Sequence, residues 1–211
     1  MVTAIINIMN WAQDLLDKIL EAIGFIGPLL LRIYIVPVFW IASNNKWNPF
    51  AENGTLNPIE GLRHTSEWFG SSLGMPLPGL MAFLAWGTEY FGAILLALGL
   101  ATRWVSVPLM FTMIVAAVTV HWQHGWQAVH DLSSPHASTH AGGAIDRLSR
   151  AKDILREHGN YDWLTEHGNF VISNSGIEWA ATYFLILLTL VVIGGGKYSS
   201  LDYWIAKKFR Q

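Results

Sequence analysis

Four long apolar segments dominate the pattern of hydrophobic and polar positions along this chain. They cover residues 22–45, 78–101, 104–121 and 177–196, to within a few positions at each end. Residues 104–120 and 179–196 contain no charged side chain, and residues 78–101 contain only Glu89. A run of about 18 or more apolar residues crosses the ~30 Å hydrocarbon core of a bilayer as a helix. The pattern therefore predicts an all-α integral membrane protein whose four spans form a four-helix bundle.

The segments between the spans are more polar and predict additional helices outside the bilayer. Residues 3–21 place apolar side chains on one side and charged ones mostly on another, which is typical of a helix lying in the membrane interface. The simplest interpretation is a helix that lies flat on the membrane before the first span and has no function of its own. Residues 144–158 have apolar positions at helical spacing and predict a short helix in the second loop. We expect one membrane domain over residues 1–211, with outer loops at 46–77 and 122–176.

The distribution of Lys and Arg predicts the orientation in the membrane. Basic residues follow the fourth span and occupy the short turn between the second and third spans: Lys197, Lys207, Lys208, Arg210 and Arg103. Because basic residues near span ends stay in the cytoplasm, we expect both termini there and the long loops outside. The N-terminal segment lacks the basic start of a signal peptide, so the first span is expected to direct insertion into a bacterial inner membrane.

Composition excludes several classes of function. The net charge is -2 and the isoelectric point is near 6.4, so there is no basic surface of the kind that binds nucleic acid. The chain has no cysteine, which excludes disulfides, thiol redox centres, cysteine-bound iron–sulfur clusters and covalently attached haem. The expected partners are therefore the lipid bilayer and other proteins, and a homo-oligomer is compatible with the sequence.

Two charged residues lie inside predicted spans and are candidates for a functional site. An ionisable side chain in the bilayer costs about 2.5–3.5 kcal/mol on insertion scales and is most often functional. Glu89 lies near the middle of the second span, and Arg32 lies about ten residues into the first. Counted along antiparallel helices, the two groups fall at nearly the same depth, which predicts an Arg32–Glu89 pair. The pair is interpreted either as a structural salt bridge or as a proton-handling site.

Histidines and aromatic residues supply the other candidates. His121 ends the third span and His124 follows on the same helix face, so His121 is a candidate proton donor or acceptor and both are candidate metal ligands. The spacing matches no zinc motif, and a solvated histidine-rich loop is the alternative. Most tryptophans fall near span ends, where aromatic belts form. Trp40, Trp86 and Tyr90 lie within spans, where they are candidates to line a pocket for a flat ring.

Three segments resemble the DoxX/DoxD family of small four-span bacterial membrane proteins. They are LLLRIYIVPVFWIASNNKW at 29–47, GTEYFGAILLALGLATRWVSVPLMFTMIVAAVTVH at 87–121 and GGGKYSSLDYW at 194–204. The positions that match the family pattern are Arg32, Lys46, Glu89, Gly92, Thr102, Arg103, His121, Gly196, Ser200 and Asp202. The loop after Trp122 has no matching counterpart.

The resemblance implies a function in electron transfer of the respiratory type in the inner membrane. We predict a subunit of a quinone-linked oxidoreductase, with Glu89, His121 and Arg32 as catalytic residues. A quinone or quinol site in the bundle is expected at Lys46, Trp40, Trp86 and Tyr90, with a protein partner that supplies or accepts electrons. The alternative is a non-enzymatic protein that handles a metal ion such as copper, or an assembly subunit of a larger complex. Retained metal or bound quinone in the purified protein would discriminate these hypotheses.

Overall fold

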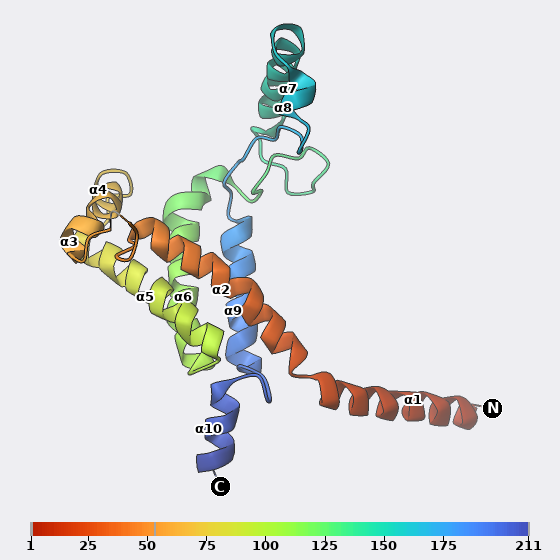
Figure 1. Cartoon of the computed structure of the whole chain (residues 1–211). Helices are drawn as coiled ribbons and strands as arrows, with labels where there is room; N and C mark the ends of the chain where they lie inside the picture. Colours follow the sequence, from red (N-terminus) through yellow and green to blue (C-terminus); the bar gives the residue numbers. More distant parts are fainter. Residues whose placement is uncertain (1, 53, 211) are drawn as a thin grey trace. The chain divides into compact units, whose positions relative to one another are not determined.

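The computed structural model describes residues 2–52 and 54–210, and within them the chain is all-helical (Figure 1). The described residues form no β-strand, and a single isolated antiparallel bridge joins Val129 and Ser173. The all-α class predicted from the apolar segments is confirmed. Asn53 and Gln211 lie outside the described residues. The prediction of a cytoplasmic C-terminus therefore concerns, at Gln211, a residue that the structure does not describe.

Three helices are long and apolar enough to cross a membrane in the described part of the chain. They are α2 (Ile26–Lys46), α5 (Pro78–Leu98) and the stretch Thr102–His124, which begins as α6 (Thr102–Ala116) and continues through a π-helical and a 3₁₀ turn. The fourth predicted span corresponds to α9 (Glu178–Ile193), an apolar helix of 16 residues. Gly194 follows with φ +79°, a left-handed conformation that ends the helix early.

The chain forms two compact units. The first contains the chain up to Met110 and the segment from Leu185 onward, and the second contains Phe111–Phe184. Besides α2 and α5, the first unit holds α1 (Val2–Ile23), α3 (Pro58–Gly61), α4 (Arg63–Ser71) and α10 (Leu201–Phe209). Helix α1 covers the predicted interfacial segment 3–21, and its apolar side chains are exposed. Its place in the membrane interface remains a prediction.

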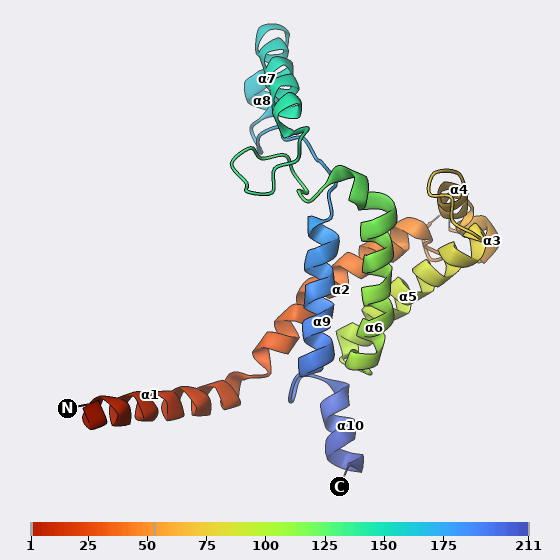
Figure 2. The same ribbon diagram turned by 180° about the vertical axis from the view of Figure 1, so that it is seen from behind.

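The core of the first unit is the contact between α2 and α5, which lie side by side in Figure 1 and Figure 2. Ile35 and Phe39 of α2 and Leu96 of α5 are fully or almost fully buried there. Gly92 lets α6 approach closely at Leu109, because a Cβ at position 92 would come within about 3.0 Å of the Leu109 side chain. Helix α4 packs on α5 through an apolar cluster of Leu62, Phe69, Ala82 and Trp86.

The second unit shows that the long polar loop is ordered by its backbone. Residues 125–130 and 172–178 run alongside each other. The backbone N–H of Ile177 donates to the carbonyl of Gly125, and that of Asn174 donates to the carbonyl of Ala128. The carboxylate of Glu178 accepts the backbone N–H of Ala128 at 2.9 Å. Beyond this pairing lie α7 (Ala141–His158), which covers the helix predicted at 144–158, and α8 (Tyr161–Leu164).

Candidate functional site

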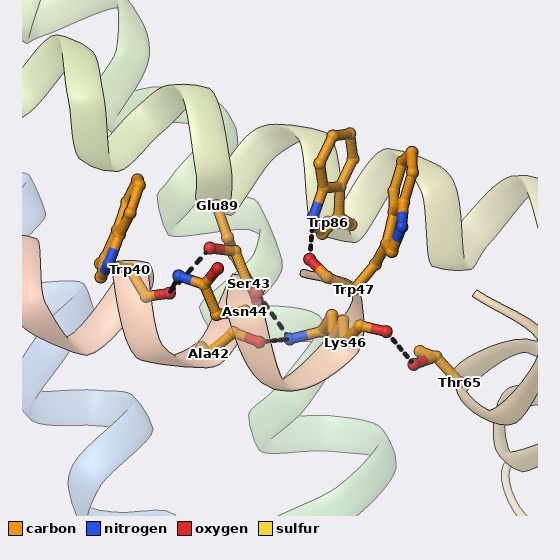
Figure 3. A network of polar contacts seen from close by, with 9 residues as sticks. All are labelled: Trp40, Ala42, Ser43, Asn44, Lys46, Trp47, Thr65, Trp86 and Glu89. Carbon is orange, nitrogen blue, oxygen red and sulfur yellow. Dashed lines mark hydrogen bonds and ion pairs between the residues drawn. The ribbon is translucent and has the colours of Figure 1, made fainter. Parts of the chain in front are cut away.

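A buried ion pair joins the end of α2 to the middle of α5 (Figure 3). The ammonium of Lys46 donates to Glu89 Oε2 at 2.6 Å, with the Glu89 side chain 7% exposed and that of Lys46 22% exposed. Lys46 Nζ also approaches the carbonyl of Ala42 at 3.4 Å, in the last turn of its own helix. That end of a helix carries partial negative charge and favours a cation. The site therefore holds an ammonium donor and a carboxylate acceptor in one largely enclosed contact.

Arg32 does not pair with Glu89, so the predicted Arg32–Glu89 pair is wrong. The guanidinium of Arg32 instead donates to the carbonyl of Leu96 at 3.2 Å and to the carbonyl of Ser199 at 2.6 Å. One cause is that α2 begins at Ile26 rather than at 22, which moves Arg32 along the span by about 6 Å. The other is that the long side chain of Lys46 reaches Glu89 from the end of the same helix.

Arg32 belongs to a second polar cluster, which closes the turn between α5 and α6. Asp202 of α10 accepts the backbone N–H groups of Ala101 and Thr102 at 2.6 and 2.8 Å, and so satisfies the first turn of α6. Gly99 lies between this cap and Arg32 with φ +63°, and a Cβ there would overlap Arg32 Nη1 and approach Ser200. These contacts involve backbone groups, which is typical of a structural role.

Aromatic rings flank the ion pair along the α2–α5 contact. Tyr90 stacks between two indoles, with ring centroids 5.2 Å from Trp40 and 5.2 Å from Trp86. Trp86 continues to Trp47 at 4.4 Å, and its indole N–H donates to the Trp47 carbonyl at 2.9 Å. Four rings thus follow one another beside the Lys46–Glu89 pair. The aromatic residues predicted for the site are brought together with Lys46 and Glu89.

A groove of about 480 Å³ opens on this contact. Its lining consists of aromatic, aliphatic and amide side chains: Trp40, Ile41, Asn44, Asn45, Asn48, Phe50 and Tyr90. Trp86 is buried behind this lining as a support for Tyr90, and Lys46 follows the lining residue Asn45 directly in sequence. The three asparagines were missed by the sequence analysis, although amides that interrupt an apolar helix end are a readable signal for hydrogen bonding. The groove offers flat ring faces and amide groups to a planar, polar ring.

His121 and His124 belong to the second unit. His121 lies at the end of the π-helical turn, where its Nδ1 is 2.6 Å from the carbonyl oxygen of Ser175. His124 is exposed, and its backbone carbonyl accepts from Asn174. Among residues 2–52 and 54–210, no three His, Asp or Glu side chains are grouped to hold a metal ion. The metal role of these histidines remains a prediction, and the structure assigns His121 a contact within its loop.

The loop after His124 contains one acid with a shifted pKa. Asp131 accepts from the Ser133 hydroxyl at 2.7 Å and from the Ser133 backbone N–H at 2.8 Å. These hydrogen bonds stabilise the carboxylate and lower the pKa of Asp131 below its ordinary value. The effect is local to an exposed turn.

Residues 27–122 match the family model described as DoxX. The resemblance to the DoxX family is confirmed over this segment. The matched segment contains α2 from Gly27 onward, α5 and α6, and with them Lys46, Glu89 and every residue of the groove. The cluster partners Ser199 and Asp202 lie outside the matched range.

A curated protein of Bacillus subtilis (strain 168), named "Putative oxidoreductase CatD", is similar to this chain. The two are 34% identical over 95 residues, which are 45% of this chain and 60% of that protein. The chain thus spans less than two thirds of the relative's length. No solved structure matches the chain.

Proposed function

We propose that this chain is a membrane subunit of a quinone-linked oxidoreductase and that the groove beside Trp40 and Tyr90 binds the quinone ring. The observation that carries the proposal is the meeting of stacked aromatic rings, amide side chains and an enclosed Lys46–Glu89 pair at one helix contact. In this proposal α9 completes a four-helix bundle with α2, α5 and α6. The protein lies in the bacterial inner membrane with both termini in the cytoplasm, as the basic tail favours.

The residues of the groove fit a quinone in size and in chemistry. A volume of about 480 Å³ falls within the range of small-molecule sites, which is roughly 300–1,000 Å³. The faces of Trp40 and Tyr90 suit a planar ring, since offset stacking of aromatic systems adds about 0.5–1.5 kcal/mol per pair. The side-chain N–H groups of Asn45 and Asn48 suit the two carbonyl oxygens. Asn44 already donates to the Trp40 carbonyl at 2.8 Å and holds that segment.

Each polar residue has a defined role in the proposal. Lys46 holds a positive charge next to the groove, where it stabilises the developing negative charge on a ring oxygen. Glu89 keeps that ammonium in place as a carboxylate, so that Lys46 would give one proton to the reduced ring oxygen and would then be reprotonated from solvent. A quinone, when bound, supplies a carrier that takes up two electrons and two protons. In this proposal a partner protein supplies the electrons, and the chain has no cysteine that could hold an iron–sulfur cluster or a thiol redox centre.

The comparisons support the same direction at a coarser level. The DoxX match covers the helices that build the groove, and the similar protein carries the name "Putative oxidoreductase CatD". Neither comparison names a quinone, a metal or a partner. The ring-binding role of the groove therefore rests on its geometry.

Quinone binding tests the proposal directly. The detergent-purified protein is titrated with decylubiquinone and with menadione, and binding is followed by quenching of tryptophan fluorescence. Tyr90→Leu removes one ring of the groove and should weaken binding about tenfold, since it deletes one stacking contact and its buried area. Trp204→Leu removes a half-exposed ring of α10 that lines no part of the groove, and its affinity should equal that of the wild type.

The opposite results are equally informative. Equal affinities for the two variants would place any quinone elsewhere and overturn the groove assignment. Metal that is retained after desalting, together with no quinone binding by the wild type, would favour the metal-handling alternative. Lys46→Met should bind quinone more weakly than the wild type. Its thermal unfolding is measured in parallel, so that loss of binding can be separated from loss of stability.

A further inference from the structure

A second cavity, of about 320 Å³, lies at the end of the apolar helices in the first unit. It is bounded by the start of α6, the glycine-rich segment after α9 and the helix α10. Its lining residues come from all three: Ala101, Arg103, Trp104, Ile193, Gly194, Gly195, Gly196, Lys197, Ser200, Asp202, Tyr203 and Arg210. None of these residues takes part in the groove or in the Lys46–Glu89 pair.

The cavity is lined by excess positive charge. Arg103, Lys197 and Arg210 are cationic, whereas Asp202 is the one acid in the lining, so the formal charge is +2. Both oxygens of Asp202 already accept backbone N–H groups, those of Ala101 and Thr102. Among the described residues, Arg103 and Arg210 form no ion pair, and Lys197 reaches only exposed Glu21 at 3.9 Å. The cations therefore face the cavity without internal counter-ions.

The glycine-rich wall keeps this cavity open. Gly194 and Gly196 adopt φ +79° and +94°, conformations that residues with side chains rarely take. A Cβ on Gly194 would lie 3.2 Å from Arg103 Nε, so a larger residue would crowd the guanidinium. The sequence GGGK does not carry the spacing of a phosphate loop. Its glycines act here by leaving room next to a row of cations.

The rim of the cavity is apolar and exposed. Trp104 is 83% exposed and Ile193 is 45% exposed, and each stands at the end of an apolar helix. In a bilayer these positions fall at the boundary between headgroups and acyl chains, where tryptophan is preferred. A ligand with both a negative headgroup and hydrocarbon chains would satisfy the cations and the rim together. A soluble phosphate ester would leave the rim unused.

We propose that this cavity binds the phosphate headgroup of an anionic phospholipid. The phosphodiester lies among Arg103, Lys197 and Arg210, and the acyl chains run along Trp104 and Ile193. The site is independent of the proposed quinone groove. It assigns a lipid-binding role to a turn and a tail that also carry the basic residues used to predict orientation.

The test uses the full-length protein in neutral detergent, with thermal unfolding as the measure of binding. Titration with phosphatidylglycerol should raise the midpoint, and phosphatidylcholine should have little effect. The double variant Arg103→Gln/Lys197→Gln should bind phosphatidylglycerol about thirtyfold more weakly, since each basic residue near a headgroup contributes roughly 1 kcal/mol. Lys207→Gln/Lys208→Gln removes the same charge from α10 outside the cavity and should match the wild type.

Three further outcomes decide the proposal. Equal weakening in both double variants would mean a general surface effect and overturn the cavity. Stabilisation of the wild type by sn-glycerol 3-phosphate as large as that by phosphatidylglycerol would identify a soluble phosphate as the ligand and overturn the lipid assignment. Native mass spectrometry of the wild type with equal amounts of both lipids needs no variant. It should retain phosphatidylglycerol selectively, and equal retention of both lipids would also overturn the proposal.

Discussion

The first unit contains two buried polar centres that differ in what their charges contact. Arg32 is 2% exposed and donates to two backbone carbonyls, at Leu96 and Ser199. Lys46 and Glu89 instead contact each other through side chains, next to a groove. The first centre ties segments of the chain together, and the second joins a proton donor to an acceptor whose sequence neighbours Asn45 and Tyr90 line the groove. A buried charge is thus informative about function only once its partners are known.

The difference predicts unequal costs of mutation, the largest of which is at Arg32. Arg32→Met removes the side-chain donor to the carbonyls of Leu96 and Ser199, of which Leu96 keeps the Gly99 N–H, and it removes a positive charge that interacts with Asp202. We expect a loss of about 5 kcal/mol in the free energy of unfolding, seen as failure to accumulate in the membrane. Arg32→Lys should not restore accumulation, because an ammonium lacks the planar fork of a guanidinium. Normal accumulation of Arg32→Met in the membrane would show that this centre is dispensable for folding. It would then not differ from the Lys46–Glu89 pair in the way proposed.

The Lys46–Glu89 pair should respond asymmetrically. Lys46→Met leaves the deeply buried Glu89 carboxylate without its cation, which we expect to cost about 3 kcal/mol. Glu89→Gln keeps a hydrogen-bond acceptor for Lys46, whose side chain is 22% exposed, and should cost about 1–2 kcal/mol. Thermal unfolding of both variants in one detergent provides the comparison. Equal costs would contradict the argument that the more deeply buried Glu89 depends more on its partner than Lys46 does.

His121 provides a smaller effect outside these two centres. Its ring contacts the Ser175 carbonyl at 2.6 Å, so His121→Ala should destabilise the second unit by about 1 kcal/mol. His124→Ala removes an exposed imidazole and should change stability by less than about 0.5 kcal/mol. Amide hydrogen exchange at residues 172–178 measures both. If quinone binding falls in His121→Ala while this exchange is unchanged, His121 has a role in the site after all.

The smallest effect is a pH dependence in the exposed turn at Asp131. Because hydrogen bonds from Ser133 lower the pKa of Asp131, the turn is favoured at pH values above the ordinary aspartate pKa. That contribution is lost as the pH falls through the lowered pKa of the folded state. An NMR titration of the Ser133 amide should therefore move in the acid range, and Asp131→Asn should abolish the movement. A titration at or above the ordinary value would contradict the two hydrogen bonds.

Much of the candidate site was readable from residue types and positions. Glu89 stands alone in a long apolar run, which identified it as a buried charge. Lys46, Trp40, Trp86 and Tyr90 were also predicted, and they meet at one helix contact. The asparagines of the groove were missed, because amides at a helix end are equally typical of a solvated loop. The partner of Arg32 was assigned incorrectly, since position along a helix does not specify which neighbour a long side chain reaches.

The sequence by itself determined the apolar helices and the residues whose burial must be compensated. These follow from local chemistry, because hydrocarbon excludes unpaired backbone groups and makes an isolated charge costly. Only the tertiary structure decided which charge meets which partner. Lys46 reaches Glu89 and Arg32 reaches backbone carbonyls because α2 starts at Ile26 and lies along α5. Which partner a buried charge contacts depends on shifts of a few ångströms between helices. The pattern of residues along the chain does not specify the size of those shifts.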